Sequence, residues 1–488
     1  MVSQACFRSF SALIKGKKSV FTLIASPHRF ACLMSQVSNF KRSLLNFWVY
    51  SITTLPKQCL AFRPTSKLRS RFLKGYLAIV DQSVVSAAHL FVSLLLARYV
   101  TPKEYGIFVL SYAVLVLISY IQRCLVVAPM TVIGAPLEGE NMRKYFTSTS
   151  LTQLILGITT TVLMLTVIGI TGIFIMRPVL LRTFYSMAFA SFSFQGQEFF
   201  RRMLFTQQRV RDAALNDLFC HCLQVIGLVI ILRLGRLSAC NAFWIILLST
   251  ALGTVYGFYQ CKGLISTDLA DFKKVVRENW DYGKWLLTSM LTQWVSGQIY
   301  VFAAAGFLTV AAAGVIGAAR NIFGLLNMVV NGLRSFIVPY ASKRFMASRL
   351  AFLKEFTNKL FLLGTAGVII YCLIVTLASQ SILDYLYKGH YKGYGYVLVL
   401  FAIQSLFAFL NFPSSIGLLI LRKTKSILYG NLFSCIATVM VAIPMVRYWG
   451  LYGACVGMII TQAILASALF WFYRIGLREK ALENIWHS

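Results

Sequence analysis

Charged residues are scarce in this chain, and acidic residues are the scarcest of them. Among 488 residues, 13% are charged, 15 are Asp or Glu, and none of these acids precedes Asp81. Hydrophobic residues make up 58% of the chain, and the mean hydropathy is +0.72. Soluble globular domains carry about 25% charged residues. This composition therefore excludes an ordinary soluble protein and indicates a membrane protein.

Metal-binding and catalytic motifs are also missing. The eleven cysteines show no C-x-x-C pair and no metal-ligand spacing, so we interpret them as small apolar residues of the membrane interior. The sequence contains no nucleotide-binding loop, nucleophile elbow or zinc-protease motif. It therefore predicts no metal, no cofactor and no enzyme activity.

The basic charge is large, because 47 Lys and Arg give a net charge of +32. On a soluble chain this excess would point to nucleic acid. Here long uncharged apolar runs interrupt the basic residues. We therefore expect no nucleic-acid partner and interpret the charge as a marker of one face of a bilayer.

The spacing of the charges predicts an all-α polytopic membrane protein, since about 20 mainly apolar residues cross a bilayer as a helix. Twelve spans are predicted, at residues 76–97, 105–130, 147–172, 178–197, 213–232, 239–260, 285–308, 311–338, 357–378, 394–420, 426–446 and 450–473. The connecting loops carry 22 Lys and Arg on one side and 9 on the other. Cytoplasmic loops collect basic residues, so both termini are predicted to be cytoplasmic.

The chain divides into five predicted parts. Residues 1–75 form a basic tail with 13 Lys and Arg, which could be an interfacial segment, a transit peptide, or a disordered leader or over-extended start. A six-helix lobe follows at residues 76–262, then a cytoplasmic linker at 263–283. A second six-helix lobe at 284–475 and a cytoplasmic tail at 476–488 complete the chain.

An internal repeat relates the two predicted lobes. At an offset of 208 residues, one set pairs Ala97, Tyr99, Val100, Thr101 and Gly106 with Ala305, Phe307, Leu308, Thr309 and Gly314. At an offset of 214 residues, a second set pairs Leu218, Phe219 and Arg233 with Leu432, Phe433 and Arg447. Six helices in each half make the repeats parallel. They predict a pseudo-two-fold axis along the membrane normal and a cavity between the lobes.

The residues of the first span and its turn carry a resemblance to a known family. The segment from Lys74 to Gly106, with the turn Thr101-Pro102-Lys103-Glu104-Tyr105-Gly106, resembles the start of the polysaccharide flippases of the multidrug, oligosaccharidyl-lipid and polysaccharide exporter superfamily. The segment from Tyr282 to Pro339 is similar to the matching region of the second lobe. The resemblance extends over about residues 74–475.

This resemblance implies two six-helix bundles that work by alternating access. It implies that undecaprenyl-pyrophosphate-linked oligosaccharides move from the cytoplasmic to the outer leaflet of the bacterial inner membrane, for O-antigen, capsule or exopolysaccharide synthesis. The implied partners are the lipid-linked oligosaccharide, membrane lipid, and a polysaccharide polymerase with chain-length machinery.

Three arginines inside predicted spans are candidate substrate-binding residues, because a charge at the bilayer centre costs about 2.5–3.5 kcal/mol on insertion scales. Arg123 and Arg334 lie near the cytoplasmic ends of their spans, and Arg320 lies nearer the middle of its span. Guanidinium groups bind phosphate oxygens in pairs. We expect Arg123 and Arg334 to capture the pyrophosphate and Arg320 to hold it. The alternative is that these side chains reach the headgroups or pair with an acid.

Other polar residues inside spans give further candidates. Gln404 and Asn411, seven residues apart on one helix face, could bind sugar hydroxyls or form interhelical hydrogen bonds. Asp81, Asp217 and His221 are candidates for coupling to a cation or proton. For both acids the alternative is a position near a helix N-terminus, where the helix dipole stabilises a carboxylate.

Two other functions remain as alternatives. One is a cation-coupled exporter of drugs or other lipids from the same superfamily. The three charges inside the spans are all Arg, and this favours an anionic substrate over a cationic drug. The other is a membrane enzyme of glycosyl transfer, for which the predicted outer segment 379–392 offers only Asp384 and His390.

Overall fold

The computed structural model describes residues 66–174, 178–266 and 271–486. The predicted basic tail lies outside these residues except for its last ten, which belong to the first helix. Leu73–Ser488 forms one compact unit. Within the described residues the secondary structure is entirely helical. The all-α polytopic fold is therefore confirmed.

The helices match the twelve predicted spans segment by segment. The first six spans correspond to α4 (Ser66–Tyr99), α5 (Pro102–Gln122) continued by α6 (Ala128–Ile133), α7 (Gly139–Phe174), α8 (Pro178–Thr206), α9 (Val210–Arg233) and α10 (Ala239–Cys261). The last six correspond to α11 (Phe272–Phe307), the two halves of α12 (Val310–Leu377), α14 (Gly395–Ile420) and the two halves of α15 (Thr424–Trp486). The short helix α13 (Ser379–Tyr387) lies between α12 and α14.

Nine stretches of the described residues are long and apolar enough to cross a membrane, and the last of them, Thr424–Ala481, is 58 residues long. α8 and α11 are not among these stretches. α8 carries charged residues toward both ends, and the uncharged part of α11 is interrupted by polar residues such as Gln293 and Gln298. Several helices also continue past the predicted spans. α11 takes in residues 272–283 of the predicted linker, and α15 runs to Trp486. Hydropathy marks only the apolar part of a helix, so charged helical ends are missed.

The second span changes its helical geometry partway along. A π-helical turn, η2 (Arg123–Val127), joins α5 to α6. Pro129 is the second residue after this turn, and its nitrogen has no hydrogen to donate to the carbonyl of Leu125. Extra residues are accommodated at such points as π-bulges. This irregular turn places Arg123 at its first position.

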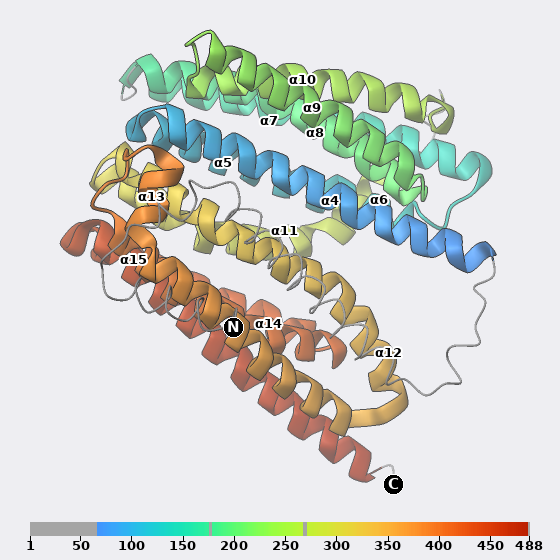
Figure 1. Cartoon of the computed structure of the whole chain (residues 1–488). Helices are drawn as coiled ribbons and strands as arrows, with labels where there is room; N and C mark the ends of the chain where they lie inside the picture. The colour runs from blue at the N-terminus through green and yellow to red at the C-terminus, as the bar shows by residue number, and fades with distance from the viewer. Residues whose placement is uncertain (1–65, 175–177, 267–270, 487–488) are drawn as a thin grey trace, which may run out of the picture. The chain divides into compact units, whose positions relative to one another are not determined.

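Two long helices each contain a pair of spans. α12 has 68 residues, which would be about 100 Å in a straight helix, but Figure 1 shows it turning back on itself. The Tyr371 hydroxyl accordingly donates to the carbonyl of Ile322 at 2.7 Å, which joins the two halves. In α15 the helix is broken at Gly450, whose φ of 60° lies in the left-handed region that glycine adopts readily.

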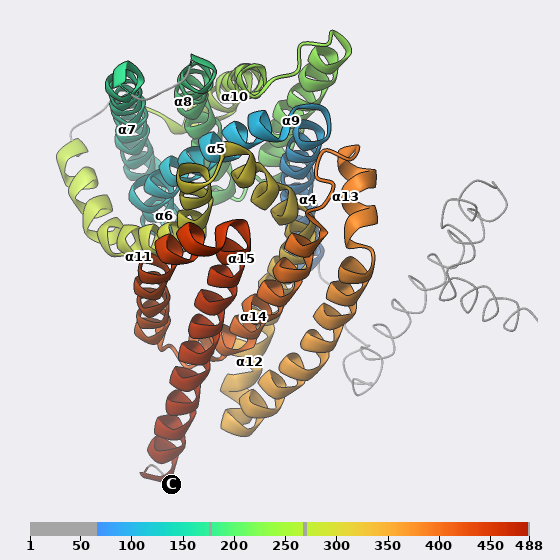
Figure 2. The same cartoon turned by 90° about the vertical axis from the view of Figure 1, so that its left-hand side faces the viewer.

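The helices form two groups, which we call the N-lobe (α4 to α10) and the C-lobe (α11 to α15). In the N-lobe, α8 packs against α7, α9 and α10. In the C-lobe, α14 packs between α12 and α15, and α11 packs on α15. Figure 2 shows the two groups from the side. The lobes meet mainly where α5 contacts α12, and where α11 contacts η2 and α5.

The contact between α5 and α12 is reciprocal, as a two-fold axis requires. A Cβ atom built on Gly106 would collide with the carbonyl oxygen of Val310, and one built on Gly314 would collide with the carbonyl oxygen of Pro102. The pairs 102 and 310, and 106 and 314, are both separated by the repeat offset of 208 residues. Repeat-related residues therefore face one another across the lobe interface.

The repeat also holds at the helix starts. The Thr101 side chain accepts from the backbone N–H of Glu104 at the start of α5, and the Thr309 side chain accepts from that of Ala312 at the start of α12. Hydroxyl side chains at this position satisfy a free N–H of the first turn. The threonines matched by the sequence repeat thus have the same structural role.

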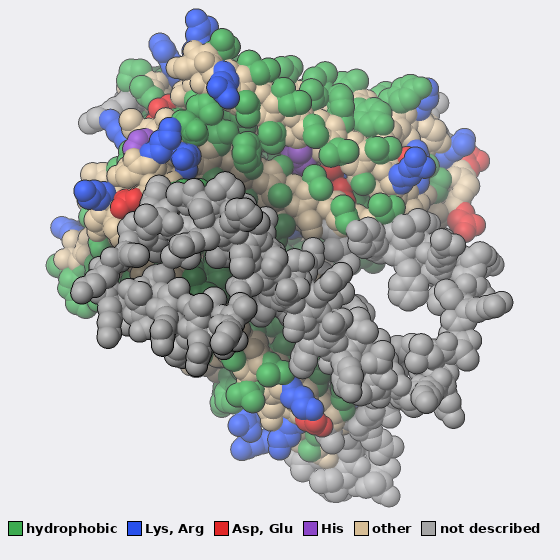
Figure 3. All heavy atoms as spheres, in the orientation of Figure 1, with side chains coloured by type: hydrophobic (Ala, Val, Ile, Leu, Met, Phe, Trp, Pro, Cys, Tyr) green, Lys and Arg blue, Asp and Glu red, His purple; other side chains and the backbone are tan. Residues whose placement is uncertain are grey.

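The outer surface agrees with a membrane environment. In Figure 3 hydrophobic side chains cover the middle of α9 and α10, with Lys and Arg gathered toward both ends of these helices. Exposed hydrophobic side chains on these helices include Ile226, Ile230, Leu248, Leu252 and Val255. Such a band would be unfavourable in water and suits lipid. The chain is therefore a multi-pass membrane protein.

Candidate functional site

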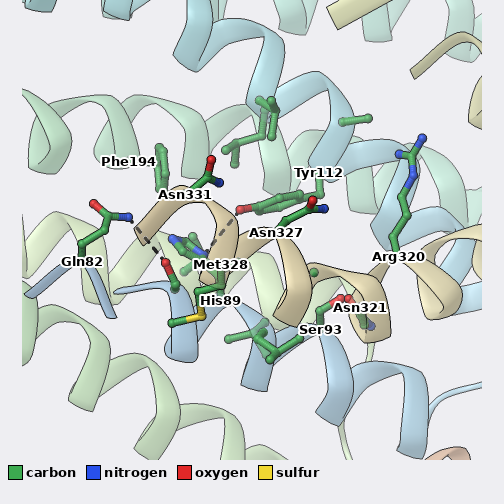
Figure 4. A pocket seen from close by; sticks show the side chains of 18 of the residues that line it. Gln82, His89, Ser93, Tyr112, Phe194, Arg320, Asn321, Asn327, Met328 and Asn331 are labelled. Carbon is green, nitrogen blue, oxygen red and sulfur yellow. Dashed lines mark hydrogen bonds between the residues drawn. The ribbon is translucent and has the colours of Figure 1, made fainter. Parts of the chain in front are cut away.

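A cavity of about 1060 Å³ lies between the two lobes. We call it the central cavity. Its N-lobe wall comes from α4, α5 and α8, and its C-lobe wall comes mainly from α12. Figure 4 shows side chains from both walls pointing toward one another, with Gln82 and His89 at one end and Arg320 at the other. The two ends have different chemistry.

At the first end a buried arginine holds three carboxylates. Arg201 on α8 is 4% exposed. Its Nε donates to Asp217 on α9, its Nη1 to Glu198 at 3.0 Å, and its Nη2 to Asp81 on α4 at 3.0 Å. Arg202 donates to the other oxygen of Glu198 at 2.7 Å. We call these five residues the acid–arginine cluster. It connects three helices of the N-lobe through charge-assisted hydrogen bonds.

One oxygen of the acid–arginine cluster lacks a donor. Asp81 is 2% exposed, and its Oδ1 has no hydrogen-bond partner among the described residues. Asp217 Oδ1 accepts from Gln197 at 2.8 Å, and both oxygens of Glu198 accept from arginines. A buried acceptor without a donor is costly. Because Asp81 lines the central cavity, this oxygen is a place where a proton or cation would be favourable.

The predicted coupling residues therefore belong to one neighbourhood. Asp81 and Asp217 share the same guanidinium, and His221 lies one helical turn beyond Asp217 on α9. His221 Nδ1 is 3.1 Å from Gln224 Oε1, and its ring is 5.4 Å from that of His89. The alternative of isolated carboxylates stabilised only by a helix dipole does not describe Asp81 or Asp217, since both pair with Arg201.

At the second end the charge is a single arginine with neutral partners. Arg320 on α12 donates to Gln298 Oε1 at 2.8 Å and to the carbonyl of Gly297 at 2.5 Å. Nearby, the Tyr105 hydroxyl bonds with Ser93 at 2.7 Å and accepts from Asn321 at 2.9 Å. These contacts join α4, α5 and α12. Arg320 thus lines the cavity as predicted, held in place by acceptors that leave its charge unbalanced.

The other two predicted arginines differ in position. Arg123 lines the central cavity and is exposed, and its guanidinium lies 5.9 Å from the Tyr120 ring centroid. Arg334 is also exposed, but the described residues that line the cavity do not include it. The structure therefore brings Arg123 and Arg320 to one cavity, while Arg334 lies farther along α12.

Gln404 and Asn411 on α14 are placed away from the central cavity, as neither is among its described lining residues. Asn411 Nδ2 donates to Gln462 Oε1 on α15 at 3.0 Å. This is the interhelical hydrogen bond that the sequence left open as the alternative to sugar binding.

Several lining residues were missed by the search for charges. Arg201 and Arg202 were expected in a cytoplasmic loop, yet α8 continues through them and Arg201 is buried. On α12 a row of amides and glycines faces the cavity, namely Gly317, Asn321, Gly324, Asn327 and Asn331. Figure 4 shows Asn327 and Asn331 opposite His89 and Tyr112. Their spacing of three to four residues is the signal that could have identified this face.

Comparisons with known proteins find similarity at the level of structure. No family model matches the sequence, and no curated protein matches it. An inward-facing multidrug resistance MATE family transporter of the MOP superfamily has a TM-score of 0.70 at 15% identity, over 83% of this chain and 99% of that one. An outward-facing MATE transporter has a TM-score of 0.59 at 15% identity, over 83% and 95%.

A MOP superfamily transporter from Pyrococcus furiosus is also similar, with a TM-score of 0.51 at 15% identity, over 83% of this chain and 95% of that one. Its description states that a reversed polarity of the binding pocket suggests a different function. The two lobes and their central cavity thus have the fold of the MATE transporters of the MOP superfamily.

Proposed function

We propose that this chain is an alternating-access exporter that moves drug-sized amphipathic molecules across a membrane, coupled to a cation. The central cavity carries this proposal, because it lies between two repeat-related lobes as a substrate site in such a transporter does. Its volume of about 1060 Å³ is close to the size of sites that enclose drug-sized ligands, roughly 300–1,000 Å³. The likeness of fold to multidrug transporters supports the same conclusion.

The lining suits an amphipathic substrate. Phe108, Tyr112, Phe194 and Met328 offer apolar and aromatic surface. The amides of α12 add hydrogen-bonding groups that carry no charge. Apolar walls with a few fixed polar groups are the usual composition of a small-molecule site.

Cation coupling is assigned to the acid–arginine end of the cavity. Asp81 and Asp217 contribute carboxylates, and His221 contributes a ring that titrates near neutral pH when unperturbed. A cation or proton arriving there would meet the unpartnered Oδ1 of Asp81. Binding of a cation at this end would change the electrostatic potential in the cavity and therefore the affinity for a charged substrate. By the same coupling, the substrate would change the affinity for the cation.

A second candidate is the export of lipid-linked oligosaccharides at a bacterial inner membrane, with the polymerase machinery as partner. The specific observation in its favour is the pair Arg123 and Arg320, which line the cavity without an acidic hydrogen-bond partner among the described residues. An anionic pyrophosphate would balance these charges. The neighbour described as having reversed pocket polarity is a precedent for variation in charge within this fold.

Transport of two dyes separates the two candidates. In proteoliposomes we expect the purified protein to move ethidium, a cationic amphipathic dye. Movement of only the anionic dye carboxyfluorescein, together with accumulation of lipid-linked oligosaccharide in cells that lack the protein, would favour the second candidate. No movement of either dye and no such accumulation would contradict both.

The role of Arg320 is tested with a matched variant on the same helix. Arg320→Ala removes a guanidinium that lines the cavity, whereas Arg334→Ala removes one that does not. We expect Arg320→Ala to raise the apparent affinity for cationic ethidium by about tenfold, because it removes a positive charge whose repulsion of the dye is on the order of 1.4 kcal/mol, and Arg334→Ala to leave it within about twofold. Equal effects at matched expression would contradict the assignment of the cavity as the substrate site.

A further inference from the structure

The first turns of α11 are fixed to the N-lobe by one of their faces. Val275 is buried and packs in a core cluster with Tyr145 and other N-lobe residues. The buried side chain of Asn279 accepts from the Tyr145 hydroxyl at 2.9 Å. A Cβ atom built on Gly283 would collide with the carbonyl oxygen of Cys124. Three successive turns of α11 therefore present the same face to the N-lobe, and the opposite face points away from it.

That opposite face is basic. At about 100° per residue, Lys273, Lys274 and Arg277 lie within an arc of about 100° that is centred opposite Val275 and Asn279. All three are exposed. Among the described residues none of them forms an ion pair with an acid. We call Lys273, Lys274 and Arg277 the basic face of α11.

Two acids lie on the same turns without neutralising the basic face. Asp281 accepts from Lys284 at 2.7 Å, so its charge is already balanced. Glu278 lies four residues after Lys274, but the two side chains do not form an ion pair in the structure. The basic face therefore keeps three cations that have no counter-charge within the described part of the chain.

Large aromatic side chains lie between the basic face and the apolar part of α11. Trp280 is 52% exposed and Trp285 is 73% exposed. Trp280 comes seven residues after Lys273, which places the two on the same side of the helix. Tryptophan is enriched where an apolar span meets the headgroups of a bilayer. On a face covered by water alone, these rings would expose apolar surface without compensation.

The end of α10 carries the same combination of groups. Lys262 Nζ lies 4.2 Å from the centroid of the Tyr259 ring, and this ring is exposed. Cys261, the residue before Lys262, belongs to the same core cluster as Val275. Figure 2 shows α11 following the edge of the molecule next to α7, which it contacts. Cations and exposed aromatic rings therefore occur together on two helices that pack on one core.

We propose that the basic face of α11 binds the headgroup of an anionic phospholipid, with Trp280 at the boundary between headgroup and acyl chains. Lys and Arg bind the phosphate, and the indole covers the apolar tail next to it. This end of α11 lies on the predicted cytoplasmic side, where anionic lipids attract basic segments. An acidic soluble protein would use the cations and leave the rings uncovered. The lipid stays outside the central cavity, so the proposal does not depend on what the chain transports.

The bound lipid would lie where the chain passes from one lobe to the other. The first turns of α11 pack on the N-lobe through Val275 and Asn279. Its last turns bury Tyr300 and Ala304, and the helix packs on α15 of the C-lobe. A headgroup held by the first turns therefore anchors the connection between the lobes to the membrane surface.

Native mass spectrometry of the full chain in detergent measures the binding directly. Dioleoyl phosphatidylglycerol is the anionic probe, and dioleoyl phosphatidylcholine is the zwitterionic probe with the same acyl chains. Each basic residue near a surface contributes about fivefold in affinity, so we expect the wild type to bind the phosphatidylglycerol tighter by roughly tenfold or more. Equal affinities for the two lipids would overturn the proposal.

Variants locate the binding on α11. The triple substitution Lys273→Gln, Lys274→Gln and Arg277→Gln should abolish the preference for phosphatidylglycerol. The triple substitution Lys273→Arg, Lys274→Arg and Arg277→Lys keeps the charge and should retain the preference. Because all these side chains are exposed, neither variant disturbs a buried contact. A preference that survives the three Gln substitutions would overturn the assignment to this face.

A matched control removes the same charge elsewhere on the predicted cytoplasmic side. Lys354 on α12, with Lys425 and Arg474 on α15, are also exposed and form no ion pair among the described residues. We expect Lys354→Gln, Lys425→Gln and Arg474→Gln together to leave the preference within about twofold. A loss as complete as that caused by the substitutions on α11 would show that only net charge matters, and would overturn the site.

Crosslinking of the wild type tests the site without any substitution. Phosphatidylglycerol with a photoreactive group in its headgroup is added to the protein, and the labelled peptides are identified. We expect labelling to concentrate on residues 272–285. Labelling that is as heavy on other basic helix ends would overturn the site. A polyglutamate peptide that binds the wild type as tightly as phosphatidylglycerol does would indicate an acidic protein as the partner, and would overturn the assignment to lipid.

Discussion

At the scale of single residues, charges inside predicted spans were a useful guide, but only to part of the site. Asp81, Asp217 and Arg320 stood out in the sequence because charges are rare there. Asp81 and Arg320 line the central cavity, and Asp217 pairs with the same arginine as Asp81. Arg201 did not stand out, because a span was predicted only as far as its apolar run continued. That run ends at Glu198, so Arg201 fell outside the predicted span. Its three partners are brought together by folding from positions 81, 198 and 217.

The acid–arginine cluster leads to a prediction about stability. Arg201→Gln would leave three buried carboxylates without their shared cation, which typically costs about 3–5 kcal/mol. We expect a large fall in the melting temperature of the detergent-purified protein. Adding Asp217→Asn should recover part of the loss, because it removes one of the uncompensated charges.

Lys359→Gln is the matched control for this prediction. Lys359 pairs with Glu355 one turn earlier on α12, and the two side chains are 67% and 66% exposed, so its removal should cost no more than about 1 kcal/mol. Melting temperatures lowered equally by Arg201→Gln and Lys359→Gln would contradict a larger contribution from the buried cluster.

At the scale of helices, the sequence predicted which segments span the membrane better than where helices begin and end. All twelve predicted spans have a helical counterpart, since each needs only a long apolar run. The ends differ because charged residues prolong α8, α11 and α15 beyond their apolar parts. The π-helical turn before Pro129 depends on local backbone geometry, and the reversal of direction within α12 depends on tertiary contacts. Hydropathy contains no information about either feature.

The contact between α5 and α12 leads to a prediction at this scale. Gly314→Ala would place a methyl group against the backbone oxygen of Pro102, which cannot rotate away. The helices would have to separate, so we expect a loss of stability of about 1–3 kcal/mol, as for other overpacked sites. Gly106→Ala should behave in the same way, since its Cβ would meet the carbonyl of Val310.

Gly367→Ala provides the comparison on the same helix. No atom lies within 4 Å of a Cβ built on Gly367, and alanine is the better helix former by roughly 0.5–1 kcal/mol. Its melting temperature should therefore equal or exceed that of the wild type. If Gly314→Ala and Gly367→Ala had the same melting temperature, this would contradict the close approach of the two lobes at Gly314.

At the scale of the whole molecule, the repeat found in the sequence explains the architecture that the structure shows. Matched threonines start α5 and α12, and matched glycines form their contact. The two cavity walls have nevertheless diverged, with a cluster of charges on the N-lobe and a row of amides on α12. The repeat could predict a cavity, but the chemistry of its walls could be read only once the helices were placed.

The proposed alternating-access cycle requires contacts between the lobes that close the cavity on the predicted outer side and break in the other half of the cycle. Arg98 at the end of α4 donates to the carbonyls of Tyr385 and Leu386 on α13, at 2.8 and 3.1 Å. These bonds join the N-lobe to the C-lobe and must break if the outer ends separate.

Hydrogen bonds from charged groups contribute about 1.5–3 kcal/mol, so Arg98→Ala should raise the ratio of outward-open to inward-open molecules by roughly tenfold to a hundredfold. Distances between spin labels on the outer ends of α5 and α12 would report this shift, with Arg233→Ala as the control because Arg233 lies at the exposed end of α9. Identical distance distributions for Arg98→Ala and the wild type would mean that other contacts hold the outer side closed.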